Sequence, residues 1–219
     1  MFSRSVMAMI VVTTVGCGAA DQRWLAAGER LAADGALTEF ALPHPMSSPT
    51  TIAIAPDGTV WFTESNGNRI GRMNPDGTHL AEFDVPTPDS APRIIALGAD
   101  GNIWFSEFNT SKIGRITPEG DVTEFDLPRP DSGPGDITAG ADGALWFIEL
   151  NGTIDGRVVN GNRVGRITLA GQVTEFPLAS NARGVGLTAG SDRQPPDRLT
   201  NRLWYADGNG NKIGYLHFH

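Results

Sequence analysis

The sequence has little or none of several features that mark common protein classes. Cys17 is the only cysteine among the 219 residues, so no disulfide can form within the chain. Lysine and arginine total 17 against 25 acidic residues, which gives a net charge of −8 and no basic stripe. A nucleic-acid backbone is itself anionic, so the charge balance argues against nucleic acid as a partner.

No apolar run of membrane-spanning length is apparent. The run Val6–Val15 has about ten residues, whereas a spanning helix needs about 20. It follows Arg4 and ends at Gly16-Cys17, a pattern typical of a signal peptide. Its end resembles a bacterial lipobox, in which the cysteine becomes lipidated. We therefore expect a signal peptide over residues 1–17 with Cys17 as the lipidation site, and a tether over residues 18–36.

These features predict an extracytoplasmic protein, either a lipoprotein of the bacterial envelope or a secreted protein. An uncleaved anchor is the remaining alternative, and contact with the membrane is expected only through the anchor or signal. Glycine (27 residues) and proline (15 residues) are plentiful, while charged residues make up only 19%. That composition favours a protein of strands and turns over a helical one.

Four tandem units of about 42 residues occupy residues 37–219. Each contains an aromatic pair that begins with tryptophan and is followed two residues later by an acid, then a basic–aliphatic–glycine triplet. The tryptophans are Trp61, Trp104, Trp146 and Trp204, and the glycines are Gly71, Gly114, Gly165 and Gly214. The glycines are spaced by 43, 51 and 49 residues, which indicates insertions near residues 152–160 and 193–201.

Each unit divides into four short segments with strand character. The second unit shows them as Ile94–Leu97, a segment around Trp104-Phe105, a segment around Ile113-Gly114, and Thr123-Glu124-Phe125. Asp-Gly or a similar turn pair separates neighbouring segments, which is typical of tight antiparallel hairpins. Four strands in about 42 residues match one blade of a β-propeller, whose sheets bury their apolar faces against one another. We therefore expect the tryptophans in the core.

The sequence thus predicts an all-β propeller with four recognisable four-stranded blades. A lone segment of the fourth-strand type, Leu37–Leu42, precedes the first complete set and could complete the last blade. A small closed ring, a partial propeller cut from a longer one, and an open arc that closes by forming a homodimer all remain open at this point.

The second and third units carry a family resemblance. Lys112-Ile113-Gly114-Arg115-Ile116, Thr123-Glu124-Phe125 and the stretch Ile137–Glu149 resemble the repeat of the streptogramin B lyases, also called virginiamycin B lyases. The resemblance covers about Leu37 to His219. It implies a seven-bladed propeller that linearises a cyclic depsipeptide antibiotic by elimination, with Mg²⁺ as cofactor. It therefore implies a carbon–oxygen lyase with a small-molecule or peptide ligand.

The family pattern includes Glu-Pro-His just before a first strand and a glutamate at the end of a second strand. In such chemistry a cation polarises the ester carbonyl and a histidine removes the adjacent proton. The glutamate recurs here, but the positions of Glu-Pro-His read Ser48-Pro49-Thr50, Ala91-Pro92-Arg93, Gly133-Pro134-Gly135 and Arg183-Gly184-Val185. A propeller that binds a ligand or a protein in the envelope without catalysis is therefore the alternative function, and a metal-dependent hydrolase of the lactonase type is a third hypothesis.

The recurrent acids at the ends of the second strands are the candidate metal ligands, namely Glu64, Glu107, Glu149 and Asp207. Carboxylate oxygens suit a divalent cation. Because the acids recur in every unit, the structural interpretation is a carboxylate that accepts hydrogen bonds from a neighbouring turn. Four further residues are candidates for a ligand-binding face because they lie in loops or at the starts of first strands: His44, Arg93, Asp136 and Arg183.

Overall fold

A computed structural model of the chain describes residues 37–154, 157–178, 184–194 and 198–218. They form fifteen strands arranged in four antiparallel sheets. The first sheet contains β1 (Pro49–Ile54), β2 (Val60–Glu64), β3 (Arg69–Met73) and β4 (Ala81–Asp84). The second contains β5 (Pro92–Leu97), β6 (Ile103–Glu107), β7 (Lys112–Ile116) and β8 (Val122–Asp126).

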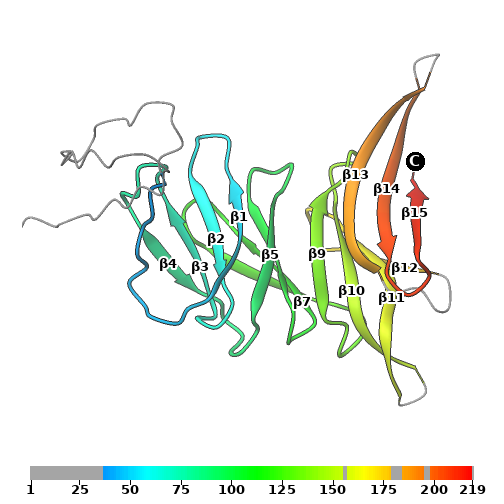
Figure 1. Ribbon diagram of the computed structural model, residues 1–219, viewed down its shortest axis with the longest axis horizontal. Helices are drawn as coiled ribbons and strands as arrows, with labels where there is room; N and C mark the ends of the chain where they lie inside the picture. Colours follow the sequence, from blue (N-terminus) through cyan, green and yellow to red (C-terminus); the bar gives the residue numbers. More distant parts are fainter. Residues whose placement is uncertain (1–36, 155–156, 179–183, 195–197, 219) are drawn as a thin grey trace, which may run out of the picture. The chain divides into compact units, whose positions relative to one another are not determined.

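The third sheet contains β9 (Pro134–Ala139), β10 (Leu145–Ile154), β11 (Arg157–Ile167) and β12 (Val173–Pro177). The fourth contains β13 (Gly184–Gln194), β14 (Arg198–Asp207) and β15 (Lys212–His217). Strands follow one another in chain order across each sheet, as the colours of Figure 1 show. The predicted all-β fold with blade-like sheets is confirmed. Among the described residues, no helix is long and apolar enough to cross a membrane.

The Asp-Gly pairs close the hairpins as their sequence predicts. Gly58, Gly101 and Gly143 all have positive φ angles, between 76° and 88°. The aspartate before each glycine accepts a hydrogen bond from a backbone N–H two residues on, as in Asn102 N to Asp100 Oδ1 at 3.2 Å. Since glycine adopts positive φ without steric cost and aspartate closes its own turn, these pairs set the register of β1–β2, β5–β6 and β9–β10.

The two insertions lengthen hairpins. β10 and β11 continue to pair from Asn151↔Asn160 out to Ile154↔Arg157, and β13 and β14 continue out to Gln194↔Arg198. β10–β11 is a second-to-third-strand hairpin and β13–β14 a first-to-second-strand hairpin, so the two extensions point in opposite directions along the strands (Figure 1).

One strand prediction is wrong. Leu37–Leu42 is not in a strand, and the fourth sheet has three strands among the described residues. A short segment forms a strand only when a neighbouring strand pairs with its backbone N–H and C=O groups. Strand propensity alone therefore does not make it a strand. The compact unit that holds the four sheets is Met46–His219.

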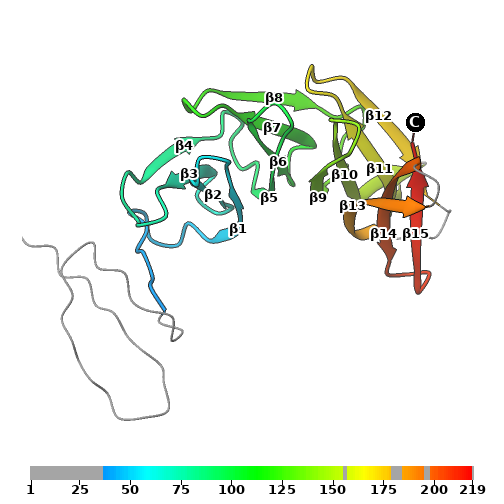
Figure 2. The same ribbon diagram turned by 90° about the horizontal axis from the view of Figure 1, so that it is seen from above.

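Within this unit the inner strands of neighbouring sheets lie side by side: β1 contacts β5, β5 contacts β9, and β9 contacts β13. Figure 2 shows β4, β8 and β12 on the opposite, outer side. Each space between sheets holds an apolar cluster. Trp61, Trp104 and Trp146 are at most 2% exposed, and each stacks on the phenylalanine of its own fourth strand, as in Trp104 on Phe125 at 5.4 Å. The expected core position is confirmed for these three tryptophans, whereas Trp204 is only partly buried.

Candidate functional site

The candidate residues Arg93 and Asp136 and the ends of the second strands lie at one edge of the sheets. Pairing of Pro92 with Glu107 and of Lys112 with Asp126 places the start of β5, the end of β6, the start of β7 and the end of β8 at the same edge. The first and third sheets repeat this register. We call this the loop edge, and the edge with the Asp-Gly turns the turn edge.

The inner strands of the first three sheets enter from the loop edge through unusual loops. In the first three sheets a buried serine (Ser47, Ser90 and Ser132) precedes the proline that starts the strand by two residues. The residues on either side of each serine have positive φ, from 50° to 62°, and five of the six are not glycine. Such backbone strain persists only where surrounding contacts hold it.

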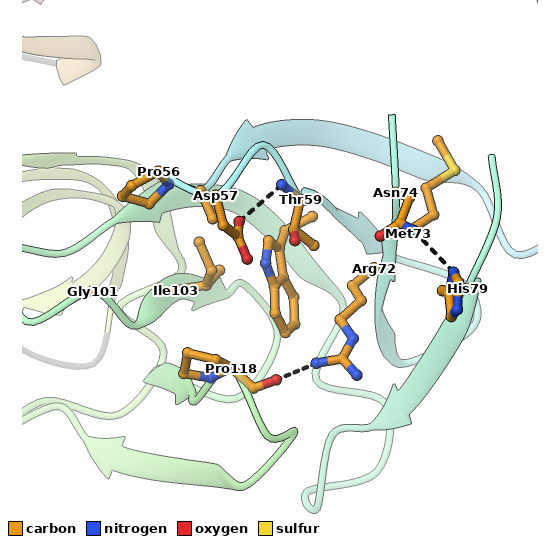
Figure 3. A pocket seen from close by; sticks show the side chains of 12 residues that line it. Pro56, Asp57, Thr59, Arg72, Met73, Asn74, His79, Gly101, Ile103 and Pro118 are labelled. Atoms are coloured by element: carbon orange, nitrogen blue, oxygen red, sulfur yellow. Dashed lines mark hydrogen bonds between the residues drawn. The ribbon is translucent and has the colours of Figure 1, made fainter. Parts of the chain in front are cut away.

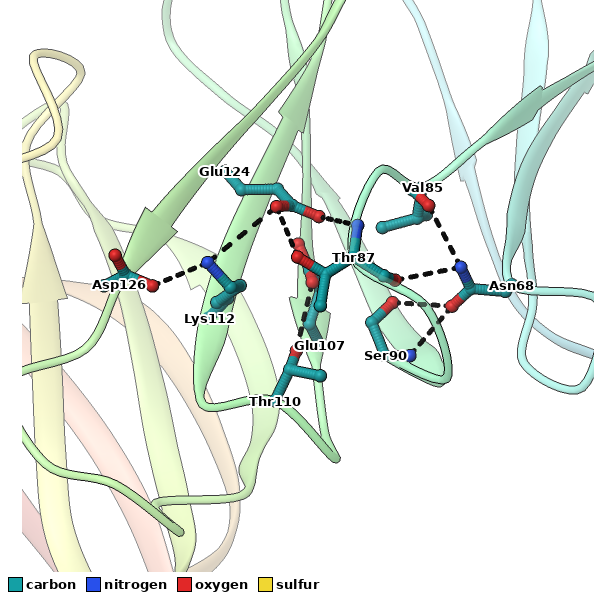
Figure 4. Close-up of polar contacts among 9 residues, drawn as sticks. All are labelled: Asn68, Val85, Thr87, Ser90, Glu107, Thr110, Lys112, Glu124 and Asp126. Atoms are coloured by element: carbon teal, nitrogen blue, oxygen red, sulfur yellow. Dashed lines mark hydrogen bonds and ion pairs between the residues drawn. The ribbon is translucent and has the colours of Figure 1, made fainter.

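The second blade shows how the contacts hold its loop (Figure 4). The Asn68 amide donates to the backbone oxygens of Val85 and Thr87 at 3.0 Å, and its Oδ1 accepts from the N–H and hydroxyl of Ser90. From the other side, Glu124 accepts from the N–H and hydroxyl of Thr87 at 2.8 and 2.6 Å. Lys112 lies 3.8 Å from Glu124. These contacts tie the loop to both sheets.

The recurrent acids lie at the ends of the second strands and are buried. Glu64 and Glu107 are 0% exposed, Glu149 1% and Asp207 8%. Thr110 donates to Glu107 at 3.1 Å, and Asp207 accepts from the backbone N–H groups of Asn209 and Gly210. For Asp207 this is the hydrogen bond from a neighbouring turn that the structural interpretation predicts.

Burial and like charge alter the acidity of two of these groups. Burial, followed by the negative charge of Glu124, raises the pKa of Glu107 to about 8. Burial, followed by the charge of Glu175, raises the pKa of Glu149 to about 7. A cation bound at either carboxylate would favour the ionised form and so oppose this rise in pKa.

The described residues do not by themselves form a metal cage. In the parts of the chain that the structure describes, no group of three or more His, Cys, Asp or Glu side chains lies close enough to hold a metal ion. The four recurrent acids therefore do not fit Mg²⁺ as a set from this chain alone. Their role as metal ligands stays a prediction from the sequence.

The remaining candidates have different environments. Arg93 is exposed at the loop edge, with its guanidinium 4.9 Å from the ring centre of Phe108. Asp136 accepts a hydrogen bond at 2.8 Å from the backbone N–H of Leu187 in the next sheet. His44 is exposed in a turn that belongs to the unit before Met46. Arg183, Cys17 and the segments 1–17 and 18–36 lie outside the described residues.

Two features of the loop edge escaped the sequence interpretation. Ser65 donates to the backbone oxygen of Pro92 at 2.6 Å, and Thr51 and Thr63 donate to that of Arg93, so hydroxyl groups of the first sheet hold the entry of the second. The other is the buried serine of each loop. The repeated Ser-x-Pro spacing at Ser47, Ser90 and Ser132 could have revealed it.

Replacing Asp136 with alanine should destabilise the fold. Leu187 is buried, so its N–H would lose its acceptor away from water. We expect Asp136→Ala to lower the free energy of unfolding by about 1–2 kcal/mol, as measured by urea denaturation. Asp121→Ala, at an exposed turn, is the matched control and should change it by less than about 0.5 kcal/mol. Equal stability of the two variants would show that Asp136 does not join the third and fourth sheets.

A hollow also lies at the turn edge, between the first and second sheets (Figure 3). It has a volume of about 490 Å³ and is lined by residues that include Trp61, Arg72 and His79. Arg72 donates to the backbone oxygen of Pro118, and His79 Nδ1 lies 2.9 Å from the amide nitrogen of Asn74. Arg72 and His79 thus make local contacts, and the hollow lies at the edge opposite to Arg93.

Comparison with known proteins assigns a family to this architecture. The model of the virginiamycin B lyase family matches residues 25–218. A virginiamycin B lyase from Staphylococcus aureus is 42% identical, with a TM-score of 0.72 over 84% of this chain and 57% of that one. A catalytically inactive histidine-to-alanine variant of the S. aureus lyase, solved with quinupristin, is 43% identical, with a TM-score of 0.71 over 83% of this chain and 56% of that one.

Two further comparisons set the limits of the likeness. A virginiamycin B lyase from Bordetella parapertussis is 46% identical over 41 residues, 19% of this chain and 14% of that one. A gluconolactonase from Xanthomonas campestris has a TM-score of 0.52 over 78% of this chain and 62% of that one, but at 17% identity it shares only the fold. The chain thus spans about 57% of the length of the S. aureus lyase it matches.

Proposed function

Because the chain belongs to the virginiamycin B lyase family, we propose that it binds a cyclic depsipeptide of the streptogramin B type at its loop edge. The observation that carries the proposal is the structural match, at 43% identity, to a lyase solved with quinupristin. The match covers 83% of this chain.

The loop edge offers chemistry that suits such a ligand. A depsipeptide presents ester and amide carbonyls together with apolar side chains. The Arg93 guanidinium can donate to carbonyl oxygens, and the Phe108 ring beside it supplies an apolar surface. Loops held by a rigid scaffold are where binding residues usually lie. The tied loops and strained backbone provide that rigidity.

Linearisation of the ligand is the second candidate function, and family membership favours it. Elimination requires a base beside the acidic C–H, and the related lyase is inactive when a histidine is replaced by alanine. In this chain the family's Glu-Pro-His positions hold no histidine. Only family membership points to Mg²⁺ as a cofactor. If it were bound, the ion would polarise the ester carbonyl. We therefore expect the chain to bind the depsipeptide but to leave its ring closed.

Binding and turnover can be measured separately on the full chain with quinupristin. We expect saturable binding by titration calorimetry, and an affinity at least about threefold weaker for Arg93→Ala, which corresponds to the loss of one modest hydrogen bond. Glu119→Ala, exposed at the turn edge, is the control and should bind as the unmodified chain does. Chromatography of the ligand after incubation with Mg²⁺ should show the ring intact.

The two candidates predict opposite chromatograms. Ring opening that EDTA abolishes would replace the binding function with the lyase function and would bring Glu64, Glu107 and Glu149 back as targets for mutagenesis. A folded chain that neither binds nor opens quinupristin would refute both.

A further inference from the structure

In two of the sheets, the aspartate of the Asp-Gly turn bonds to the tryptophan of the strand that follows it. Trp104 Nε1 donates to Asp100 Oδ1 at 3.2 Å in the second sheet, and Trp146 Nε1 donates to Asp142 Oδ1 at 3.1 Å in the third. The carboxylate thus closes the turn and also satisfies the indole N–H of a buried side chain.

The first sheet has the same two residue types without this bond. Asp57 holds the place of Asp100 in the turn, and Trp61 holds that of Trp104 in the strand. Asp57 accepts a hydrogen bond at 2.9 Å from the backbone N–H of Thr59. Within the part of the chain that the structure describes, the indole N–H of Trp61 has no acceptor, although this side chain is only 2% exposed. This buried donor is therefore available to a ligand.

One methyl group explains the difference. Gly98 and Gly140 lie two residues before the bonded aspartates, where an added Cβ would be 2.5 Å from Asp100 Oδ1 and 2.4 Å from Asp142 Oδ1. The same Cβ would be 2.6 and 2.5 Å from the two indole nitrogens. Ala55 holds this position in the first sheet and has that Cβ. Its methyl group therefore occupies the space in which carboxylate and indole meet in the other two sheets.

The hollow at the turn edge opens beside these residues (Figure 3). Ala55, Asp57 and Trp61 all line it. Its volume of about 490 Å³ lies within the range of about 300–1,000 Å³ that is typical of ligand sites. Prolines and an isoleucine supply apolar lining, namely Pro56, Pro118 and Ile103. An apolar lining with a few convergent polar groups is the usual composition of a site for a small molecule.

The polar groups of the hollow favour a neutral ligand with hydroxyl groups. Asp57 contributes a carboxylate and Arg72 a guanidinium, so their charges balance. The hydrogen bond from the Thr59 N–H lowers the pKa of Asp57, which keeps the carboxyl ionised at neutral pH. The carboxylate can then only accept hydrogen bonds, and the indole N–H of Trp61 can only donate. A hydroxyl group does both, so one ligand hydroxyl can link the two.

We propose that this hollow binds a neutral polyhydroxylated ligand of the size of a hexose, with one hydroxyl bridging Asp57 and Trp61. The ligand restores the link that the methyl group of Ala55 prevents. Arg72 uses one N–H for the backbone oxygen of Pro118, and its remaining N–H groups can donate to further hydroxyls. The site lies at the turn edge, so it does not depend on the function proposed for the loop edge.

An NMR titration of the full chain with D-glucose, D-galactose and D-mannose tests the proposal. The reporter is the indole N–H resonance of Trp61, which Trp61→Phe identifies among the five tryptophans. We expect a saturable shift with at least one hexose and a Kd of about 1 mM, a modest affinity for a small ligand. Tetrahydropyran has the ring of a hexose without its hydroxyl groups and should leave the resonance unchanged.

Two substitutions act on the bridge in different ways. Ala55→Gly makes the first sheet like its neighbours, so the bond between Asp57 and Trp61 should form and compete with the ligand. Asp57→Ala removes the acceptor for the ligand hydroxyl. Each should weaken hexose binding at least about tenfold, as expected for a hydrogen bond to a charged group. Asp121→Ala, at an exposed turn of the second sheet, is the matched control and should bind as the unmodified chain does.

Three results would overturn the proposal. The absence of a saturable shift with all three hexoses up to about 100 mM would show that the hollow does not take this class of ligand. An equal response to tetrahydropyran would show that hydroxyl groups are not what the site recognises. Unchanged affinity in either Ala55→Gly or Asp57→Ala, with circular dichroism showing a folded variant, would show that no hydroxyl bridges Asp57 and Trp61.

Discussion

The free energy of unfolding of this chain should fall as the pH is raised from about 5 to about 8, because two glutamates are buried in protonated form. The pKa of Glu107 is raised from 4.5 to about 8 in the folded protein and that of Glu149 to about 7. Between pH 4.5 and these values, the unfolded chain has released protons that the folded chain retains. Stability therefore decreases as the pH rises through this window, by up to about 1.4 kcal/mol per pH unit for each group.

Glu107→Gln separates the two contributions. Glutamine cannot ionise, so the variant's loss of stability should level off as the pH passes about 7, where Glu149 is half ionised in the folded protein. The unmodified chain should continue to lose stability between pH 7 and pH 8. Urea denaturation at half-unit pH intervals measures both curves. Glu119→Gln, at an exposed turn, should reproduce the unmodified curve.

One outcome of this comparison between the two stability curves would contradict the protonated state of Glu107. If Glu107→Gln and the unmodified chain lose stability in parallel from pH 7 to pH 8, Glu107 is ionised in the folded protein at pH 7. The buried carboxylate would then have a compensating charge or ion. That result would support the hypothesis that a cation binds at Glu107.

Gly114→Ala should be among the most destabilising single changes in the chain. A Cβ at this position would lie 2.1 Å from the ring of Phe105, far inside van der Waals contact. Phe105 is fully buried between the second sheet and its neighbour, so the ring has no free space into which to move. Overpacking of this kind costs about 3 kcal/mol, and we expect that loss in the free energy of unfolding by urea denaturation.

Two further variants test the cause. Gly186→Ala is the matched control, because its Cβ would meet its nearest neighbour at an ordinary 3.7 Å and its backbone does not have positive φ. It should change stability by less than about 1 kcal/mol. Combining Gly114→Ala with Phe105→Leu should recover part of the loss, since the smaller side chain removes the clash. If the double variant shows the sum of the two single losses, the steric explanation is wrong.

Much of the fold could be predicted because its signals are local and repeated. Asp-Gly pairs close turns through their own backbone and side-chain chemistry, so the hairpins at Gly58, Gly101 and Gly143 follow from the residues themselves. The tryptophan of each unit recurs in a segment that has no other way to bury it than against a neighbouring sheet. The placement of Trp61, Trp104 and Trp146 in the core was therefore predictable.

The candidate site was harder to predict, because the same residue type serves different needs in different surroundings. Asp136 was expected at a ligand-binding face, whereas the structure pairs it with the backbone of Leu187 in the next sheet. Arg93 has the exposure at the loop edge that its position predicted. The contact between Asn68 and the loop at Ser90 joins residues 22 positions apart, and no local pattern in the sequence marks it.

By itself, the sequence determined the all-β class, the repeat, the turns and the family, because each depends on residues close together along the chain. Only the tertiary structure decided that Leu37–Leu42 is not a strand, that Glu107 is buried beside Glu124, and that Trp61 and Pro118 line one hollow. These outcomes depend on which distant segments come together. Burial and pairing are properties of neighbours in space, and the same isoleucine is core or surface according to whether another sheet covers it.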